Sequence, residues 1–184
     1  KSVDFTGYWQ RHVEGNRSRV NYKLISDNVI NDLGDTEDKH FYSLSGIDFW
    51  RTFSIIAYNL VSSKQGESTI TQQLARNQFS EEDRAHNPIY RFIQKLQEQI
   101  TAVKIEKHYT KQEIITMYLN TVSFGGKIKG VKSAAQTYFN TTPDKLTPDQ
   151  AAVLIGILKG TTWFSPIRHP DKSITRRNFI LGRM

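Results

Sequence analysis

One long segment with helical periodicity constrains the fold of this chain more than any other feature. From about residue 89 to residue 108, apolar side chains recur at the spacing of an amphipathic helix. Ile93, Leu96 and Ile100 lie on the apolar stripe, which we expect to be buried. The opposite face carries Lys95 and Glu98 at helical spacing, and from pattern alone it is an ordinary solvated face.

Caps and periodicity predict further helices along the chain. Ser26 can cap a helix in which Val29, Ile30 and Leu33 share one face. The other predicted helices are an aromatic-rich amphipathic segment at 49–61, two helices that open with capping boxes at 110–113 and 147–150, and a last helix that reaches 184.

A polar stretch from 66 to 77 is dense in uncharged hydrogen-bonding side chains. Ser68 is the predicted N-cap of a short helix in which Ile70 and Leu74 share the apolar face. Two interpretations fit the rest of this helix: a surface that orients a polyhydroxylated or anionic ligand, or a capped surface helix with a small polar network. Spacing alone favours the second. The polar residues concerned are Thr69, Gln72, Gln73 and Arg76.

A charge-rich stretch runs from residue 37 to residue 48. It opens with two adjacent carboxylates, Glu37 and Asp38, beside a lysine and a histidine, and Phe41 follows. From the pattern alone we interpret it as a solvated turn that is anchored by Phe41.

Composition limits the classes of partner. The chain has 184 residues, enough for one domain with a sizeable core. Its formal charge of +7 and pI of about 9.6 favour anionic partners such as phosphorylated substrates, anionic lipid or nucleic acid. The absence of cysteine excludes disulfides and thiolate metal sites. No apolar run reaches the ~18 residues of a transmembrane helix. The chain begins at Lys1 with no visible signal peptide, and we expect this end to be a cut.

The polar stretch carries a resemblance to a known family. Its sequence, Gly-x-Ser-Thr-Ile-Thr-Gln-Gln-Leu-x-x-Asn, resembles the second motif of the family 51 glycosyltransferases, the peptidoglycan glycosyltransferases of class A penicillin-binding proteins and monofunctional transglycosylases. The other motifs of that family follow in order. Residues 37–48 resemble the first motif, 94–98 the third, 118–139 the fourth and 165–184 the fifth.

Three positions depart from the family pattern. Leu44 stands where the first motif usually has histidine, and Glu67 stands where the second has a small residue. Gln94 replaces the arginine of the third motif. Arg91 lies one turn earlier on the face of Lys95, so it is the candidate to supply the missing guanidinium.

The resemblance implies a mainly α, lysozyme-like fold with a larger globular helical lobe and a smaller membrane-facing lobe that includes 49–61. It covers residues 25–184 as a single glycosyltransferase domain, with 1–24 as a lead-in segment.

The resemblance also implies a reaction and a set of site residues. The family polymerises lipid II by inverting transfer from an undecaprenyl-pyrophosphate-linked glycan to the GlcNAc 4-hydroxyl. Glu37 is the expected general base, and Glu98 is the second catalytic candidate. A divalent cation (Mg²⁺ or Mn²⁺) is possible rather than required as a cofactor, with Glu98 as its candidate ligand. The expected substrate-binding residues are Asp38, Phe41, Ser68, Thr69, Gln72, Gln73, Arg76, Arg91 and Lys95.

Other functions remain open from the sequence. A lytic transglycosylase would share the fold and a catalytic glutamate, and a non-catalytic domain could bind lipid II as a scaffold. The expected partners are lipid II, the lipid-linked glycan chain, the membrane surface and a cell-wall synthesis complex, at the extracytoplasmic face of the bacterial membrane. No helix concentrates lysine and arginine into a groove-reading face, so nucleic acid is not an expected partner.

Overall fold

The computed structural model describes residues 19–42, 68–77 and 88–183, with the side chains of 88–92 excepted. The fold of these ranges is mainly helical, which agrees with the lysozyme-like class expected from the motifs. Within them, the one β-type contact is an isolated bridge between Ser123 and Lys129. The elements in chain order are η1 Tyr22–Leu24, α2 Asp27–Glu37, α4 Ile70–Arg76, α5 Pro88–His108, α6 Lys111–Thr121, α7 Val131–Phe139, η3 Pro143–Lys145, α8 Pro148–Leu158 and α9 Pro170–Leu181.

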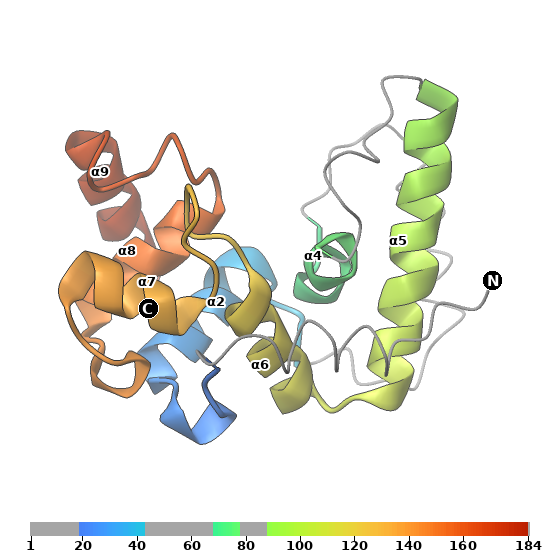
Figure 1. Cartoon of the computed structure of the whole chain (residues 1–184), viewed down its shortest axis with the longest axis horizontal. Coiled ribbons are helices and arrows are strands. Elements are labelled where there is room, and N and C mark those ends of the chain that lie inside the picture. Colours follow the sequence, from blue (N-terminus) through green and yellow to red (C-terminus); the bar gives the residue numbers. More distant parts are fainter. Residues whose placement is uncertain (1–18, 43–67, 78–87, 184) are drawn as a thin grey trace.

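The helices form a larger body with a two-helix unit beside it. Figure 1 shows α2, α6, α7, α8 and α9 gathered on one side, with α4 and the long α5 on the other. Within the body α8 packs on α9 and on α2. Outside it, α4 contacts both its neighbour α5 and helix α6 of the body. Helix α4 therefore joins the two parts. The aromatic segment expected in a membrane-facing lobe, 49–61, lies outside the described residues.

The predicted caps start the helices of the body. Ser26 Oγ accepts a hydrogen bond from Asn28 N at 3.2 Å, and Val29, Ile30 and Leu33 are buried, as predicted. Both capping boxes are also confirmed, at Thr110 before α6 and at Thr147 before α8. Each box satisfies donors that a helix N-terminus otherwise leaves unpaired.

Helix α5 presents a different face to the protein from the one predicted. Ile93 is 43% exposed and Ile100 is 51% exposed, so the prediction that this stripe is buried is wrong. The buried face instead carries Glu98, Gln99 and Thr101, together with Ala102 and Ile105. This face is buried because α5 packs against α4. Arg76 of α4 and Ser68, just before it, pair with the polar side chains Glu98 and Lys95 of α5.

Residues just before η1 are tied to the body through Asn120. Its side-chain amide donates to Val20 O and its carbonyl accepts from Val20 N, both at 2.9 Å. The backbone around Asn120 is also packed closely against Gly130, which has φ +80°. A Cβ at Gly130 would lie 2.7 Å from Asn120 O, so glycine is required there. The end of α6 is therefore fixed on two sides.

Candidate active site

The candidate base Glu37 is the last residue of α2. The helix continues through Gly34, and Asp38 N closes it by donating to Gly34 O at 3.1 Å. Glu37 is half-buried, and its Oε2 accepts a hydrogen bond from Gln73 Nε2 of α4 at 3.1 Å. The first two family motifs, 36 positions apart at these residues, therefore meet at the carboxylate.

The Gln73 amide is held by three partners. Besides Glu37, its Nε2 donates to Ser68 O at 3.1 Å, and its Oε1 accepts from the Tyr118 hydroxyl of α6 at 2.8 Å. Tyr118 is fully buried, and its burial, followed by the negative charge of Glu37, raises the pKa of its phenol well above the usual range. Tyr118 therefore remains a hydrogen-bond donor at physiological pH.

Two cations converge on one hydroxyl beside this amide. Ser68 Oγ accepts from Arg76 Nη2 at 3.0 Å and from Lys95 Nζ at 3.4 Å. Glu98 Oε2 lies 3.1 Å from Lys95 Nζ and 3.5 Å from Arg76 Nε. Glu98 is only 5% exposed. A buried carboxylate thus holds both cations of α4 and α5 in place. Together with Glu37 and Gln73, we call Ser68, Arg76, Lys95 and Glu98 the polar cluster.

Ser68 is not the N-cap of α4, which corrects the sequence prediction. The cap is Thr69, whose Oγ1 accepts from Gln72 N at 3.2 Å. Moving the cap by one residue frees the Ser68 hydroxyl to accept from the two cations. Ile70 and Leu74 are buried, as the spacing predicted.

The remaining expected site residues have structural contacts. Asp38 Oδ2 accepts from Ile70 N at 3.3 Å and so anchors the start of α4. Burial raises the pKa of the Asp38 carboxyl, while this backbone bond and the Lys111 ammonium oppose the rise. Phe41 is 2% exposed and lies in the core, and Gln72 is buried at 9% exposure. The side chain of Arg91 lies outside the described residues, as do Leu44 and Glu67.

The sequence did not point to a second network that ties α4 to α5 and α6. Thr71 Oγ1 donates to Glu106 Oε1, and Lys111 Nζ lies 2.6 Å from Glu106 Oε2. Lys111 also lies 4.4 Å from the centre of the Phe41 ring. Tyr118 opens the stretch 118–139 that resembles the fourth motif, but that resemblance gave no reason to place its hydroxyl at the site. Motif spacing gives no signal for such contacts, since each crosses between helices.

The described part of the chain offers little for a metal ion. Within it, no group of three or more His, Asp or Glu residues is placed to bind one. The Oε2 atom of Glu98 already contacts two cationic side chains. A divalent cation at Glu98 stays a prediction.

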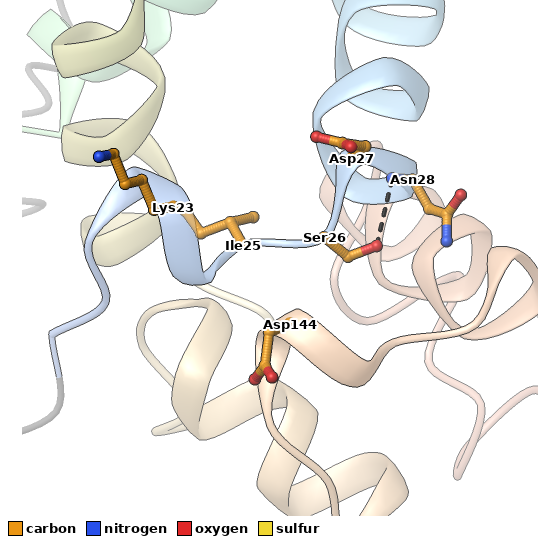
Figure 2. A pocket seen from close by; sticks show the side chains of 6 residues that line it. All are labelled: Lys23, Ile25, Ser26, Asp27, Asn28 and Asp144. Atoms are coloured by element: carbon orange, nitrogen blue, oxygen red, sulfur yellow. Dashed lines mark hydrogen bonds between the residues drawn. The ribbon is translucent and has the colours of Figure 1, made fainter.

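A separate hollow lies at the other end of α2. It has a volume of about 400 Å³. Figure 2 shows its lining of mainly polar side chains, with Ser26 bonded to Asn28. Asp27, which lines the hollow, and Glu37 lie at opposite ends of α2, about 15 Å apart along the axis, and none of the expected site residues lines the hollow. Its lining residues are Lys23, Ile25, Ser26, Asp27, Asn28 and Asp144.

Among the described helices, none has the combination of length and apolar sequence needed to cross a bilayer.

Comparisons with known proteins agree with the geometry. The model of the family described as "Transglycosylase" matches residues 6–184. Penicillin-binding protein 1A of Escherichia coli is 38% identical over 93% of this chain, and penicillin-binding protein 1F of Bacillus subtilis is 37% identical over 92%. Penicillin-binding protein 1A of Aquifex aeolicus is 36% identical over 91%. The matched region is 20% to 23% of the length of these relatives. The chain belongs to the transglycosylase family, the peptidoglycan glycosyltransferases.

Proposed function

We propose that this chain polymerises lipid II into glycan strands, by inverting transfer from an undecaprenyl-pyrophosphate-linked donor to the GlcNAc 4-hydroxyl of lipid II. The observation that carries the proposal is the polar cluster: a carboxylate beside two cations, assembled from three helices of a transglycosylase-family chain. Such a pairing suits a reaction in which a hydroxyl loses a proton while an anionic group departs.

Glu37 acts as the general base in this proposal. Glutamate side chains are ordinarily ionised at neutral pH and can accept a proton in the transition state. Gln73 engages Oε2 of Glu37, so Oε1 is the oxygen assigned to the acceptor hydroxyl. The half-buried position of Glu37 allows a sugar to approach it.

Arg76 and Lys95 stabilise the leaving pyrophosphate. Arg76, Lys95 and Glu98 together carry one net positive charge, which favours an anion beside them, whereas Glu37 supplies the negative charge beside Gln73. A pyrophosphate whose charge is balanced in this way leaves without being protonated. Glu98 touches the cations and holds them in position, and Ser68 lies between them as a neutral hydrogen-bonding group.

The proposed setting is the extracytoplasmic membrane surface, where a lipid-linked donor and acceptor are both available. The net charge of +7 suits anionic lipid head groups as well as pyrophosphate. A cell-wall synthesis complex is the proposed wider partner.

Incubating the purified chain with fluorescent lipid II in detergent tests this function. We expect glycan polymers that a muramidase then digests. A chain that makes no polymer but cuts preformed glycan strands would be a lytic enzyme instead. A folded chain that binds lipid II without turnover would be a scaffold.

Lys95→Ala and Glu98→Ala should each lower kcat/KM for polymerisation by about 10- to 100-fold. The first removes a cation, and the second leaves two cations without the buried carboxylate that holds them. Initial rates of polymer formation measure both effects. Asp149→Ala is a control, because that carboxylate is exposed and lies 3.9 Å from Arg177 in a surface pair. If Lys95→Ala and Glu98→Ala form polymer at rates near that of the parent chain, then these two side chains have no part in the reaction.

A further inference from the structure

The buried hydroxyl of Tyr118 is connected to the candidate base Glu37 through a single residue, Gln73. It donates to Gln73 Oε1 at 2.8 Å, and the same amide donates to Glu37 Oε2 at 3.1 Å. We propose that Tyr118 is a positioning residue that acts through Gln73 to orient the Glu37 carboxylate. The inference rests on the proposed function and adds a residue that touches no substrate.

The direction of each hydrogen bond follows from the chemistry of the partners. Ser68 O is a carbonyl oxygen and can only accept, so the end of the Gln73 amide that faces it must be the NH₂ group. That group has two protons, and the second points to Glu37 Oε2. The other end of the amide is then Oε1, so Tyr118 must be the donor. All the protons of this amide are therefore used.

The position of Tyr118 makes its hydroxyl a fixed donor. It has no exposed surface, and it lies on α6 among the buried residues Ile114, Ile115 and Leu119. Its raised pKa keeps the proton on the phenol across the pH range of an activity assay. Neither rotation into solvent nor ionisation competes with the bond to Gln73.

Loss of this donor would undo the orientation of the base. Without the hydroxyl, Gln73 Oε1 is left with a hydrocarbon ring as its buried neighbour, which is unfavourable for a polar atom. The Gln73 amide is then held only through Nε2, by its bonds to Ser68 O and Glu37 Oε2, and its oxygen end has no partner to fix it. The donor that orients Glu37 and stabilises its charged form is therefore less firmly placed.

Tyr118→Phe tests the inference, with Tyr138→Phe as the matched control. The Tyr138 hydroxyl also donates to a protein oxygen, Phe124 O at 2.8 Å, but it has no contact with the polar cluster in the described structure. In lipid II polymerisation we expect Tyr118→Phe to lower kcat about tenfold and to change KM by less than about twofold. We also expect the acid limb of its plot of kcat against pH to move to higher pH, because a less firmly placed Gln73 amide stabilises the carboxylate of the base less well. Tyr138→Phe should leave kcat and the acid limb unchanged.

A double-mutant cycle with Gln73→Leu separates positioning from a general loss of packing. If Tyr118 acts through Gln73, then Tyr118→Phe should have almost no further effect on kcat in the Gln73→Leu background. Additive losses would overturn the proposal, as would an unchanged acid limb or equal losses of kcat in the two tyrosine variants. Circular dichroism melts establish that each variant is folded. If the parent chain itself makes no polymer, the proposed function has failed; if only these variant effects are missing, the positioning role has failed.

Discussion

A Glu37→Gln variant is expected to lose lipid II polymerisation by about 10²- to 10⁴-fold while it still binds lipid II. Glutamine keeps the size of the side chain, and its amide oxygen can accept the hydrogen bond that Gln73 Nε2 donates. What disappears is the ability to take a proton from the acceptor hydroxyl. Polymerisation rates from fluorescent lipid II, together with lipid II binding measured by anisotropy, separate these two effects.

Glu113→Gln is the matched control for this substitution. Glu113 is an exposed residue of the capping box of α6, where glutamine performs the same capping role. It should polymerise at nearly the parent rate. A Glu37→Gln enzyme that also polymerises at the parent rate would exclude Glu37 as the base, and the carboxylate with the next best position, Glu98, would have to be reconsidered.

The local helix signals of the sequence were sufficient where the contacts are local. Ser26, Thr110 and Thr147 cap the helices that follow them, because a cap needs only its own first turn. At Ser68 and Thr69 the same reasoning chose the wrong hydroxyl. By the local pattern either residue can cap α4, but in the structure the Ser68 hydroxyl accepts from Arg76 and from Lys95, which lies 27 positions away.

Helix α5 shows the limit of periodicity more clearly. The pattern correctly divides the helix into an apolar and a polar face, but it does not say which face a neighbour covers. The polar face is buried because Glu98 pairs with Arg76 and Lys95, and Ile93 and Ile100 are left exposed. The family motifs predicted that Glu37, Gln73 and the two cations belong to one site. The hydrogen bond from Tyr118 to Gln73 crosses between helices, so only the structure reveals it.

The second large effect is expected on stability, at a residue that the reaction does not use. Asp32 lies on α2, which packs on α8, and it has no exposed surface. Neither carboxyl oxygen has a hydrogen-bond partner among the described residues. Burial, and then the charge of Asp35, raises the pKa of Asp32 from 3.8 to about 6. An ionised carboxylate at this place opposes folding.

The sign of the pH dependence follows from that shift. Between pH 3.8 and about 6 the folded chain holds the Asp32 proton more tightly than the unfolded chain does, so stability falls as pH rises through this window. Above it the charge costs about 3 kcal/mol, because each pKa unit corresponds to about 1.4 kcal/mol. Asp32→Asn resembles the protonated acid and carries no charge. It should therefore raise the free energy of unfolding at pH 7.5 by up to about 3 kcal/mol, and by almost nothing near pH 4.

Urea denaturation at several pH values measures this difference. Asp27→Asn is a useful control on the same helix, since Asp27 is exposed in the first turn of α2. It should lower stability by no more than about 1 kcal/mol, through the loss of a favourable charge at the helix N-terminus, and keep the parent's slope between pH 4 and 6. If Asp32→Asn also keeps that slope, Asp32 is not the group responsible. A flattened slope with unchanged polymerisation would show that α2 tolerates a destabilising buried acid on one face while its last residue, Glu37, serves the reaction.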